Sequence, residues 1–147
     1  MQLQLAANNV VTFRGSGQGP VTAILTSGTG ASLQVIVPAG ARTGTLSVGS
    51  VGGQAGLGKV FFLPPSITGF SIAGGPVGYD ININGDNFSF ESQQSTVVKF
   101  NGTVATAFSV LSGTSIKVTI PAGAMTGTVT VQTPGGTATS PTVFTIR

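Results

Sequence analysis

The sequence predicts an all-β protein built from two tandem β-sandwich domains, and three observations lead to that fold class. Apolar and polar residues alternate in short runs, such as residues 116–120 and 129–133, with the two-residue period of a half-buried strand. Turn-forming residues separate these runs, with 23 Gly and 8 Pro among the 147 residues. The two halves of the chain also repeat each other. Short strands joined by turns, without a long helical period, favour a sandwich.

The internal repeat sets the domain organisation. The eight residues from Pro38, PAGARTGT, recur from Pro121 as PAGAMTGT, an offset of 83 residues. Further matches are residues 32–37 with 115–120 and 60–61 with 143–144 at that offset, and residues 10–13 with 97–100 at an offset of 87. The first copy therefore holds four extra residues in its Gly-rich stretch. We expect two domains, residues 1–63 and residues 64–147, joined by the stiff Leu63-Pro64-Pro65.

The second copy has the more complete set of expected strands, at residues 65–70, 79–85, 97–100, 116–120 and 129–133. Pro121 ends the strand before it because proline has no N–H to donate. Few residues precede the first strand of the first copy. Gln2-Leu3-Gln4-Leu5 is the candidate counterpart of the strand at Ile81 and Ile83, and the opening strand at residues 65–70 has no counterpart.

A missing strand exposes N–H and C=O groups along a sheet edge. Three arrangements would satisfy them: the second domain covers the edge, another chain adds a strand, or the first domain is a smaller sandwich. We expect contact with another chain, because only 6% of the residues are charged and such a surface resists association poorly. A weakly charged repeat within a larger extracellular protein is the competing explanation.

The motifs of the second copy resemble the IPT/TIG domain, an immunoglobulin-like β-sandwich. In order, they are Pro65-Ser66-Ile67, Gly78, Ile83-Asn84-Gly85-Asp86-Asn87-Phe88, Val98-Lys99-Phe100-Asn101-Gly102, residues 116–121, Gly127-Thr128-Val129-Thr130-Val131, Gly135-Gly136 and Phe144. The first copy is similar to the same domain without its opening strand. The resemblance implies two immunoglobulin-like domains, supplies no catalytic residues, and is shared by bacterial surface proteins, accessory modules of polysaccharide-acting enzymes, receptors and some transcription factors.

Catalytic, cofactor and metal sites are not expected. The chain has no His and no Cys, and its three carboxylates are Asp80, Asp86 and Glu91. General acid–base catalysis needs a tunable pair, so the sequence predicts no enzyme, although a Ser–Lys arrangement stays open. Net charge is +3 from singly placed bases, which disfavours nucleic-acid binding. No apolar run reaches the length of about 20 residues that membrane insertion needs.

Two motifs resemble ligand-binding loops, but each is better explained as an ordinary strand or turn. Residues 80–91 fit the spacing of a calcium loop of the EF-hand type, but Ile81 and Ile83 alternate with Asp80 as in a strand with one inward face. A looser calcium site using Asp80, Asp86 or Glu91 is the alternative. Residues 15–20 are Gly-rich like a phosphate-binding loop, yet lack its Lys and predict a hairpin loop.

A glycan is the alternative partner, and the aromatic content of the chain argues against it. Sugar-binding surfaces favour exposed Trp and Tyr, and the chain has no Trp and one Tyr, Tyr79; its nine Phe mostly occupy inward strand positions.

These observations predict a non-enzymatic structural protein that binds through β-sandwich contacts. The leading hypothesis is a virion protein, such as a phage capsid decoration or cement protein, contacting other virion proteins as a homo-oligomer or lattice. Met1-Gln2-Leu3-Gln4-Leu5 lacks the features of a secretory signal, which fits assembly in the host cytoplasm. In this hypothesis the acid-free residues 1–64 form the docking end. The alternative is a spacer or glycan-binding module cut from a larger bacterial surface or secreted protein.

Overall fold

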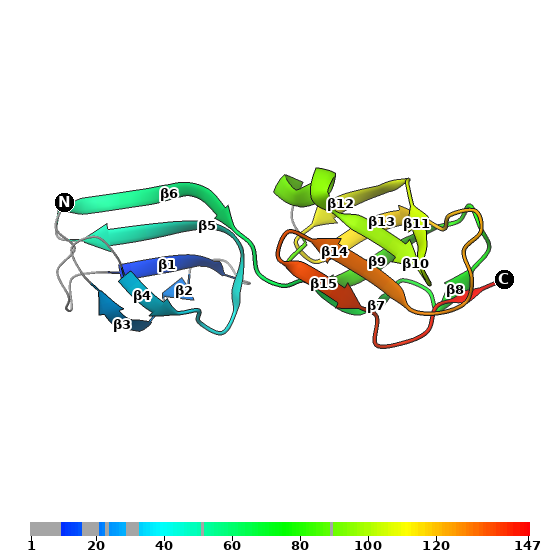
Figure 1. Ribbon diagram of the computed structural model, residues 1–147, viewed down its shortest axis with the longest axis horizontal. Helices are drawn as coiled ribbons and strands as arrows, with labels where there is room; N and C mark the ends of the chain where they lie inside the picture. Colours follow the sequence, from blue (N-terminus) through cyan, green and yellow to red (C-terminus); the bar gives the residue numbers. More distant parts are fainter. Residues whose placement is uncertain (1–9, 16–20, 23, 29–32, 51, 89) are drawn as a thin grey trace. The chain divides into compact units, whose positions relative to one another are not determined.

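The chain forms two compact units, Met1–Phe61 and Phe62–Arg147, in a computed structural model. The structure describes residues 10–15, 21–22, 24–28, 33–50, 52–88 and 90–147. Strands dominate both units, and η1 (Phe90–Ser95), a 3-10 helix, is the one helical element in these residues (Figure 1). The all-β fold class predicted from the sequence is confirmed.

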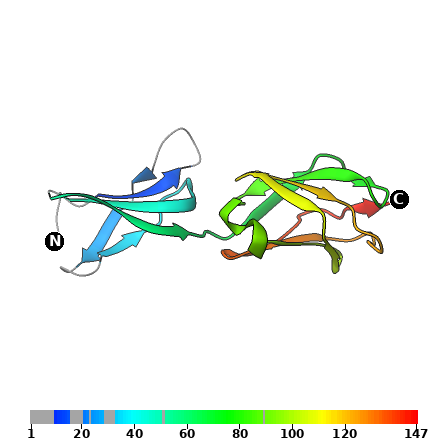
Figure 2. The ribbon, with the colours of Figure 1, turned by 90° about the horizontal axis from the view of Figure 1, so that it is seen from above.

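The second unit is a sandwich of two antiparallel sheets, which Figure 2 shows as separate layers. One sheet has the order β12-β13-β9-β7 and the other has the order β11-β10-β14-β15. Their strands are β7 (Ser66–Phe70), β9 (Asp80–Asp86), β10 (Val97–Phe100), β11 (Thr103–Ala105), β12 (Phe108–Ser112), β13 (Ser115–Thr119), β14 (Val129–Thr133) and β15 (Gly136–Thr139). Two further short strands, β8 (Gly74–Gly75) and β16 (Thr145–Ile146), pair parallel with each other and form a separate two-stranded sheet.

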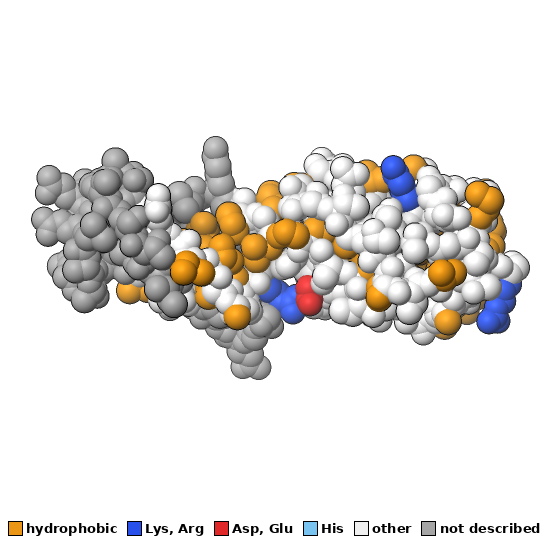
Figure 3. Space-filling model, turned by 60° about the horizontal axis from the view of Figure 1, so that its bottom comes forward, with side chains coloured by type: hydrophobic (Ala, Val, Ile, Leu, Met, Phe, Trp, Pro, Cys, Tyr) orange, Lys and Arg blue, Asp and Glu red, His pale blue; other side chains and the backbone are white. Residues whose placement is uncertain are grey.

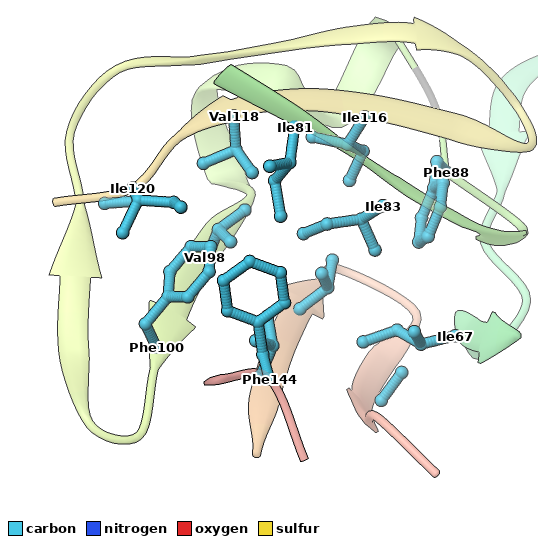
Figure 4. Packing of buried hydrophobic residues seen from close by; sticks show 14 of the residues in the cluster. Ile67, Ile81, Ile83, Phe88, Val98, Phe100, Ile116, Val118, Ile120 and Phe144 are labelled. Carbon is cyan, nitrogen blue, oxygen red and sulfur yellow. The ribbon is translucent and has the colours of Figure 1, made fainter. Parts of the chain in front are cut away.

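The core of this unit follows from the alternation in its strands. Ile81 and Ile83 on β9 are 2% and 0% exposed, and they lie opposite Val118 and Ile116 of β13. Figure 4 shows these four side chains facing Phe144, which comes from the C-terminal segment. The strand interpretation of residues 79–85, with the two isoleucines inward, is therefore confirmed.

Glycine permits a close approach and a tight turn in the second unit. A Cβ on Gly85 would collide with the carbonyl oxygen of Ser66 on the neighbouring strand β7. The β10–β11 hairpin turns through Asn101 and Gly102, whose φ angles are 46° and 91°. Two successive positive φ values define the type I′ turn, which Asn-Gly favours and which matches the twist of paired strands.

The first unit has a four-stranded sheet, β2-β1-β5-β6, and a two-stranded sheet, β3-β4. Its strands are β1 (Val10–Gly15), β2 (Val21–Thr22), β3 (Ile24–Gly28), β4 (Leu33–Ile36), β5 (Ala41–Ser50) and β6 (Gly53–Phe61). The expected loop at residues 16–20 lies outside the described residues, and the strands on either side of it pair antiparallel. The candidate strand Gln2-Leu3-Gln4-Leu5 also lies outside them.

The two units share one strand register. Equivalent pairs at the offsets found in the sequence are Val11–Val48 with Val98–Val131, and Val48–Ala55 with Val131–Ala138. An edge-to-face ring contact repeats as well: Phe13 and Phe61 have centroids 5.5 Å apart, and Phe100 and Phe144 have centroids 5.4 Å apart. The sequence repeat is thus also a repeat of pairing and packing.

The pairing of β1 with β5 in the first unit extends further at one end than the equivalent pairing of β10 with β14. β5 begins at Ala41 and pairs as far as Gly15, whereas β14 begins only at Val129. The reason lies in the partner strand, because the tight turn at Asn101 ends β10 at Phe100 while β1 continues past the equivalent position.

Candidate functional site

Asp80 and Lys117, two oppositely charged residues of the second unit, meet on the solvent face of the β9–β13 pair. Asp80 begins β9 and lies directly opposite Thr119, while Lys117 is two residues away on β13 and its side chain points to the same face. The Thr119 hydroxyl donates to Asp80 Oδ1 at 2.6 Å, and Lys117 Nζ lies 2.9 Å from Asp80 Oδ2. Both charged side chains are about half exposed.

These neighbours keep Asp80 ionised. The hydrogen bond from Thr119, followed by the hydrogen bond and positive charge of Lys117, lowers the pKa of Asp80 below its ordinary value of 3.8. A carboxylate with a lowered pKa is a poor general base near neutral pH, because such a base needs a pKa close to the working pH. Asp80 is therefore better suited to hold neighbouring polar groups by hydrogen bonds than to transfer protons.

Two hollows open beside this group. One of about 280 Å³ is lined by Asp80, Lys117 and Thr119 together with Ala107, Phe108, Ser109 and Val118. A second, of about 290 Å³, shares Ala107 and Thr119 and is lined by apolar groups of Val77, Ile120 and Pro121. Tyr79, which is 55% exposed, lies between Gly78 and Asp80 in the sequence. Surface hollows of this size can hold one sugar-sized group but do not enclose it.

The Ser–Lys arrangement left open by the sequence has a candidate within the described strands. Ser109 on β12 pairs with Lys117 across the same sheet. The ammonium of Lys117 is held by Asp80 at 2.9 Å. A charged ammonium in an ion pair does not accept the hydroxyl proton, so this pair lacks the activated base that a nucleophilic serine needs.

The acidic residues proposed for a looser calcium site are spread along one strand. Asp80 begins β9 and Asp86 ends it, and the side chain of Glu91 lies outside the described residues. In the described part of the chain, no three His, Cys, Asp or Glu side chains gather as metal ligands would. Residues 80–86 form a strand, so the EF-hand spacing here does not belong to a loop between two helices.

The cross-strand group of Asp80, Lys117 and Thr119 was not predicted from the sequence. Asp80 and Thr119 are 39 residues apart in the sequence, and only the pairing of β9 with β13 brings Asp80 to the two residues of β13. The sequence did show that the two expected strands at residues 79–85 and 116–120 each have polar residues on their outward faces. Knowing that these strands are neighbours would have placed Asp80 opposite Thr119.

The surface is weakly charged, and no helix in the described residues has the length and hydropathy to cross a membrane. On the face in Figure 3, charged side chains are few among uncharged polar and apolar groups. Among the phenylalanines whose side chains the structure describes, those with little exposure are Phe13, Phe88, Phe100 and Phe144.

Residues 65–146 match the family model of the IPT/TIG domain. No curated protein matches the chain. Among solved structures, an auxiliary nutrient binding protein from Bacteroides thetaiotaomicron matches 57% of the chain at 23% identity with a TM-score of 0.50. SGBP-B from a xyloglucan utilization locus in Bacteroides uniformis matches 92% at 19% identity with a TM-score of 0.49. A gamma-CGTase from Bacillus clarkii matches 99% at 17% identity with a TM-score of 0.46.

The matched region is a small part of each of these proteins. It covers 21% of the nutrient binding protein, 41% of SGBP-B and 20% of the CGTase. At 23% identity, the similarity to the nutrient binding protein concerns the fold.

Proposed function

Because the chain belongs to the IPT/TIG domain family, we propose that it is a non-catalytic immunoglobulin-like module of a larger bacterial surface or secreted protein, in which it spaces and positions other domains. The two units then act through their folded shape and their surfaces. The first unit is in this proposal an immunoglobulin-like domain of the same kind with fewer strands.

The observation that carries the proposal is how the segment entering the second unit is fastened. Asn87 Nδ2 donates to the carbonyl oxygen of Pro64 at 2.9 Å, and Pro65 is buried. The carbonyl oxygen of Leu63 approaches the backbone so closely that a Cβ on Gly135 would collide with it. A spacer needs such a fixed point of entry, because a loose linker would not hold its neighbour in a defined direction.

Two further observations support a non-catalytic module of a larger protein. The nutrient binding protein that shares the fold is about five times longer than the part matched, since the match covers 21% of it. The carboxylate of Asp80 is engaged by Thr119 and Lys117, so its role is that of an ordered surface group. Neither the family match nor the reported solved structures support the virion function expected from the sequence.

The experiment that tests the proposal is the native mass of the untagged chain by light scattering from micromolar to millimolar concentration. A spacer is expected to stay a monomer over the whole range. A closed oligomer, or an assembly that grows with concentration, would contradict the proposal and favour a protein that assembles with its own copies.

A glycan-binding role is the second candidate, and the two adjoining hollows near Tyr79 favour it. An exposed tyrosine beside apolar and hydrogen-bonding groups suits the faces and hydroxyls of a sugar ring. Retardation of the chain in native gels containing soluble β-glucans would support it, provided that Tyr79→Ala and Lys117→Ala abolish the retardation. Met125→Ala is the matched control, because Met125 is 61% exposed and lines neither hollow. Unretarded migration of the native chain would exclude this role for the tested glycans.

A further inference from the structure

Backbone hydrogen bonds join the first and last segments of the second unit directly. β8, which follows the first strand β7, pairs parallel with β16, the last strand. The amide of Thr145 donates to the carbonyl oxygen of Ala73 at 3.1 Å. The amide of Arg147 donates to the carbonyl oxygen of Gly75, also at 3.1 Å. The segment by which the chain enters the unit is therefore tied to the segment by which it leaves.

The parallel direction of this pair decides how it responds to a pull on the two ends of the unit. The chain enters the second unit at one end of the sandwich and leaves it at the other, as Figures 1 and 2 show. Such a pull draws β8 toward its start and β16 toward its end, so it acts along both strands. The bonds of a parallel pair are evenly spaced along it. They then share the load and must break together, whereas a pull on the same end of both strands breaks them one after another.

β16 is also fastened to the body of the sandwich. Phe144, just before it, is 1% exposed and exchanges two backbone hydrogen bonds with Gly127, at 2.8 and 3.1 Å. The amide of Ile146 donates to Oγ1 of Thr126 at 2.9 Å, and the Ile146 side chain packs against the core. A load that reaches β16 through β8 is therefore passed to the folded core.

Two glycines bring β8 close to its surroundings. A Cβ on Gly74 would collide with the carbonyl oxygen of Thr145. Gly75 is buried, and a Cβ on it would lie 3.3 Å from Cδ1 of Ile120 and 3.5 Å from Cδ1 of Ile72. A hydrogen bond in such apolar surroundings is electrostatically stronger than one in water. The close packing around β8 therefore strengthens its bonds to β16.

We propose that the second unit carries tension, and that the pair of β8 with β16 is the clamp that resists it. This function rests on the proposed spacer role, since a spacer between two domains that are held apart is pulled at its two ends. Resistance to forced unfolding depends on the rate of unfolding, and not on the free energy of unfolding alone. The clamp slows unfolding in this one direction of pull, so the spacer keeps its length under load.

Pulling the full chain in two directions with optical tweezers tests the clamp. The chain has no Cys, so a pair of introduced cysteines defines both attachment points. Ala73→Cys with Arg147→Cys loads opposite ends of the parallel pair, and Ala73→Cys with Val143→Cys loads the same end. All three side chains are exposed, and the first unit lies outside the loaded segment in both variants.

We expect the variant loaded at opposite ends to unfold at a force at least about twice that of the variant loaded at the same end, because its bonds break together. Equal forces, or the reverse order, would overturn the proposal. The measurement uses single molecules and does not depend on self-association. Equal forces would therefore contradict the clamp without contradicting the spacer role, which light scattering tests separately.

A substitution inside the clamp supplies a second readout. Gly74→Ala, added to the variant loaded at opposite ends, is expected to lower the unfolding force by at least about one third, because the new Cβ pushes β8 away from β16. Gly69→Ala on β7 is the matched control, because no atom lies within 4 Å of its added Cβ. The control should leave the force within about one tenth. An unchanged force in Gly74→Ala, or equal losses in the two variants, would overturn the proposal.

Discussion

The first and second units have the same strand ladder around differently covered cores. Phe144 is 1% exposed and contacts the rings of Phe100 and Phe70, the latter with centroids 5.1 Å apart. Its counterpart Phe61 is half-buried and contacts Phe13. The sheet that carries β13 has four strands, whereas the described part of its counterpart has two.

The difference shows that register and stability have separate origins. Register comes from local features that both copies keep: the alternation of side chains, the turns, and glycine at one close approach. Stability depends on how fully the second sheet covers the first, because buried apolar area supplies most of the favourable free energy of folding. Substitutions at equivalent positions should therefore affect the two units in the same order but with different magnitudes.

The largest difference is expected for the repeated ring contact. Phe144→Ala should lower the free energy of unfolding of the second unit by about 3–5 kcal/mol, because it removes a fully buried ring. Phe61→Ala should cost the first unit less than about 2 kcal/mol, because its ring is partly solvated. Urea unfolding followed by hydrogen exchange assigns each loss to its unit. Equal losses would show that the two cores are equally closed.

The end of the inward row provides the next comparison. Ile120 is 1% exposed and its counterpart Val37 is 40% exposed. Ile120→Ala should cost about 2–4 kcal/mol, whereas Val37→Ala should stay within about 0.5 kcal/mol. A large loss for Val37→Ala, measured as a shift of the urea midpoint, would mean that another segment buries Val37 in solution.

Gly44 and Gly127 occupy equivalent positions in the two units, and each allows a close contact with the neighbouring strand. A Cβ on Gly44 would lie 2.6 Å from Cδ of Arg14, and a Cβ on Gly127 would collide with the side chain of the equivalent Asn101. Asn101 is fixed by its turn and donates from Nδ2 to the carbonyl oxygen of Thr126 at 3.1 Å. Gly127→Ala should therefore cost about 1–3 kcal/mol and Gly44→Ala less.

Gly56→Ala is the control for these two substitutions, because no atom lies within 4 Å of its added Cβ. We expect an unchanged thermal midpoint for this variant. A loss as large as that of Gly127→Ala would show that backbone freedom, and not the close approach, explains all three glycines.

The smallest effect is expected at the charged group, which only the second unit has. The lowered pKa of Asp80 means that its ionised form stabilises the fold at pH values above its unfolded-state value, 3.8. This contribution should disappear as the pH falls through the lower folded-state pKa. Asp80→Asn should remove this part of the pH dependence of unfolding and leave stability near pH 7 almost unchanged, because the pair is solvent-screened. An unaltered acid titration in the variant would contradict the assignment.

Much of the fold could be predicted because its signals are local. The alternation at Ile81 and Ile83 and the repeat around Pro38 and Pro121 gave strands whose positions the structure confirms in the second unit. The opening strand expected at residues 65–70 is also confirmed as β7. These features depend on side-chain period and turn chemistry, which a single sequence displays.

The candidate site could not be predicted in the same way. The meeting of Asp80 with Thr119 depends on which strands become neighbours, and that is decided by the packing of two sheets. The long start of β5 at Ala41 was likewise hidden, because the matching segment of the second copy precedes its strand. Tertiary pairing, and not local propensity, decides both features.

The central claim is that the two units share the same strand pairing but bury their cores to different extents. Pulsed hydrogen exchange of the full chain across a urea gradient tests it most directly. We predict that amides of β1, β5 and β6 lose protection at clearly lower urea than those of β10, β14 and β15. Loss of protection in both sets at the same urea concentration, as one cooperative transition, would contradict the claim.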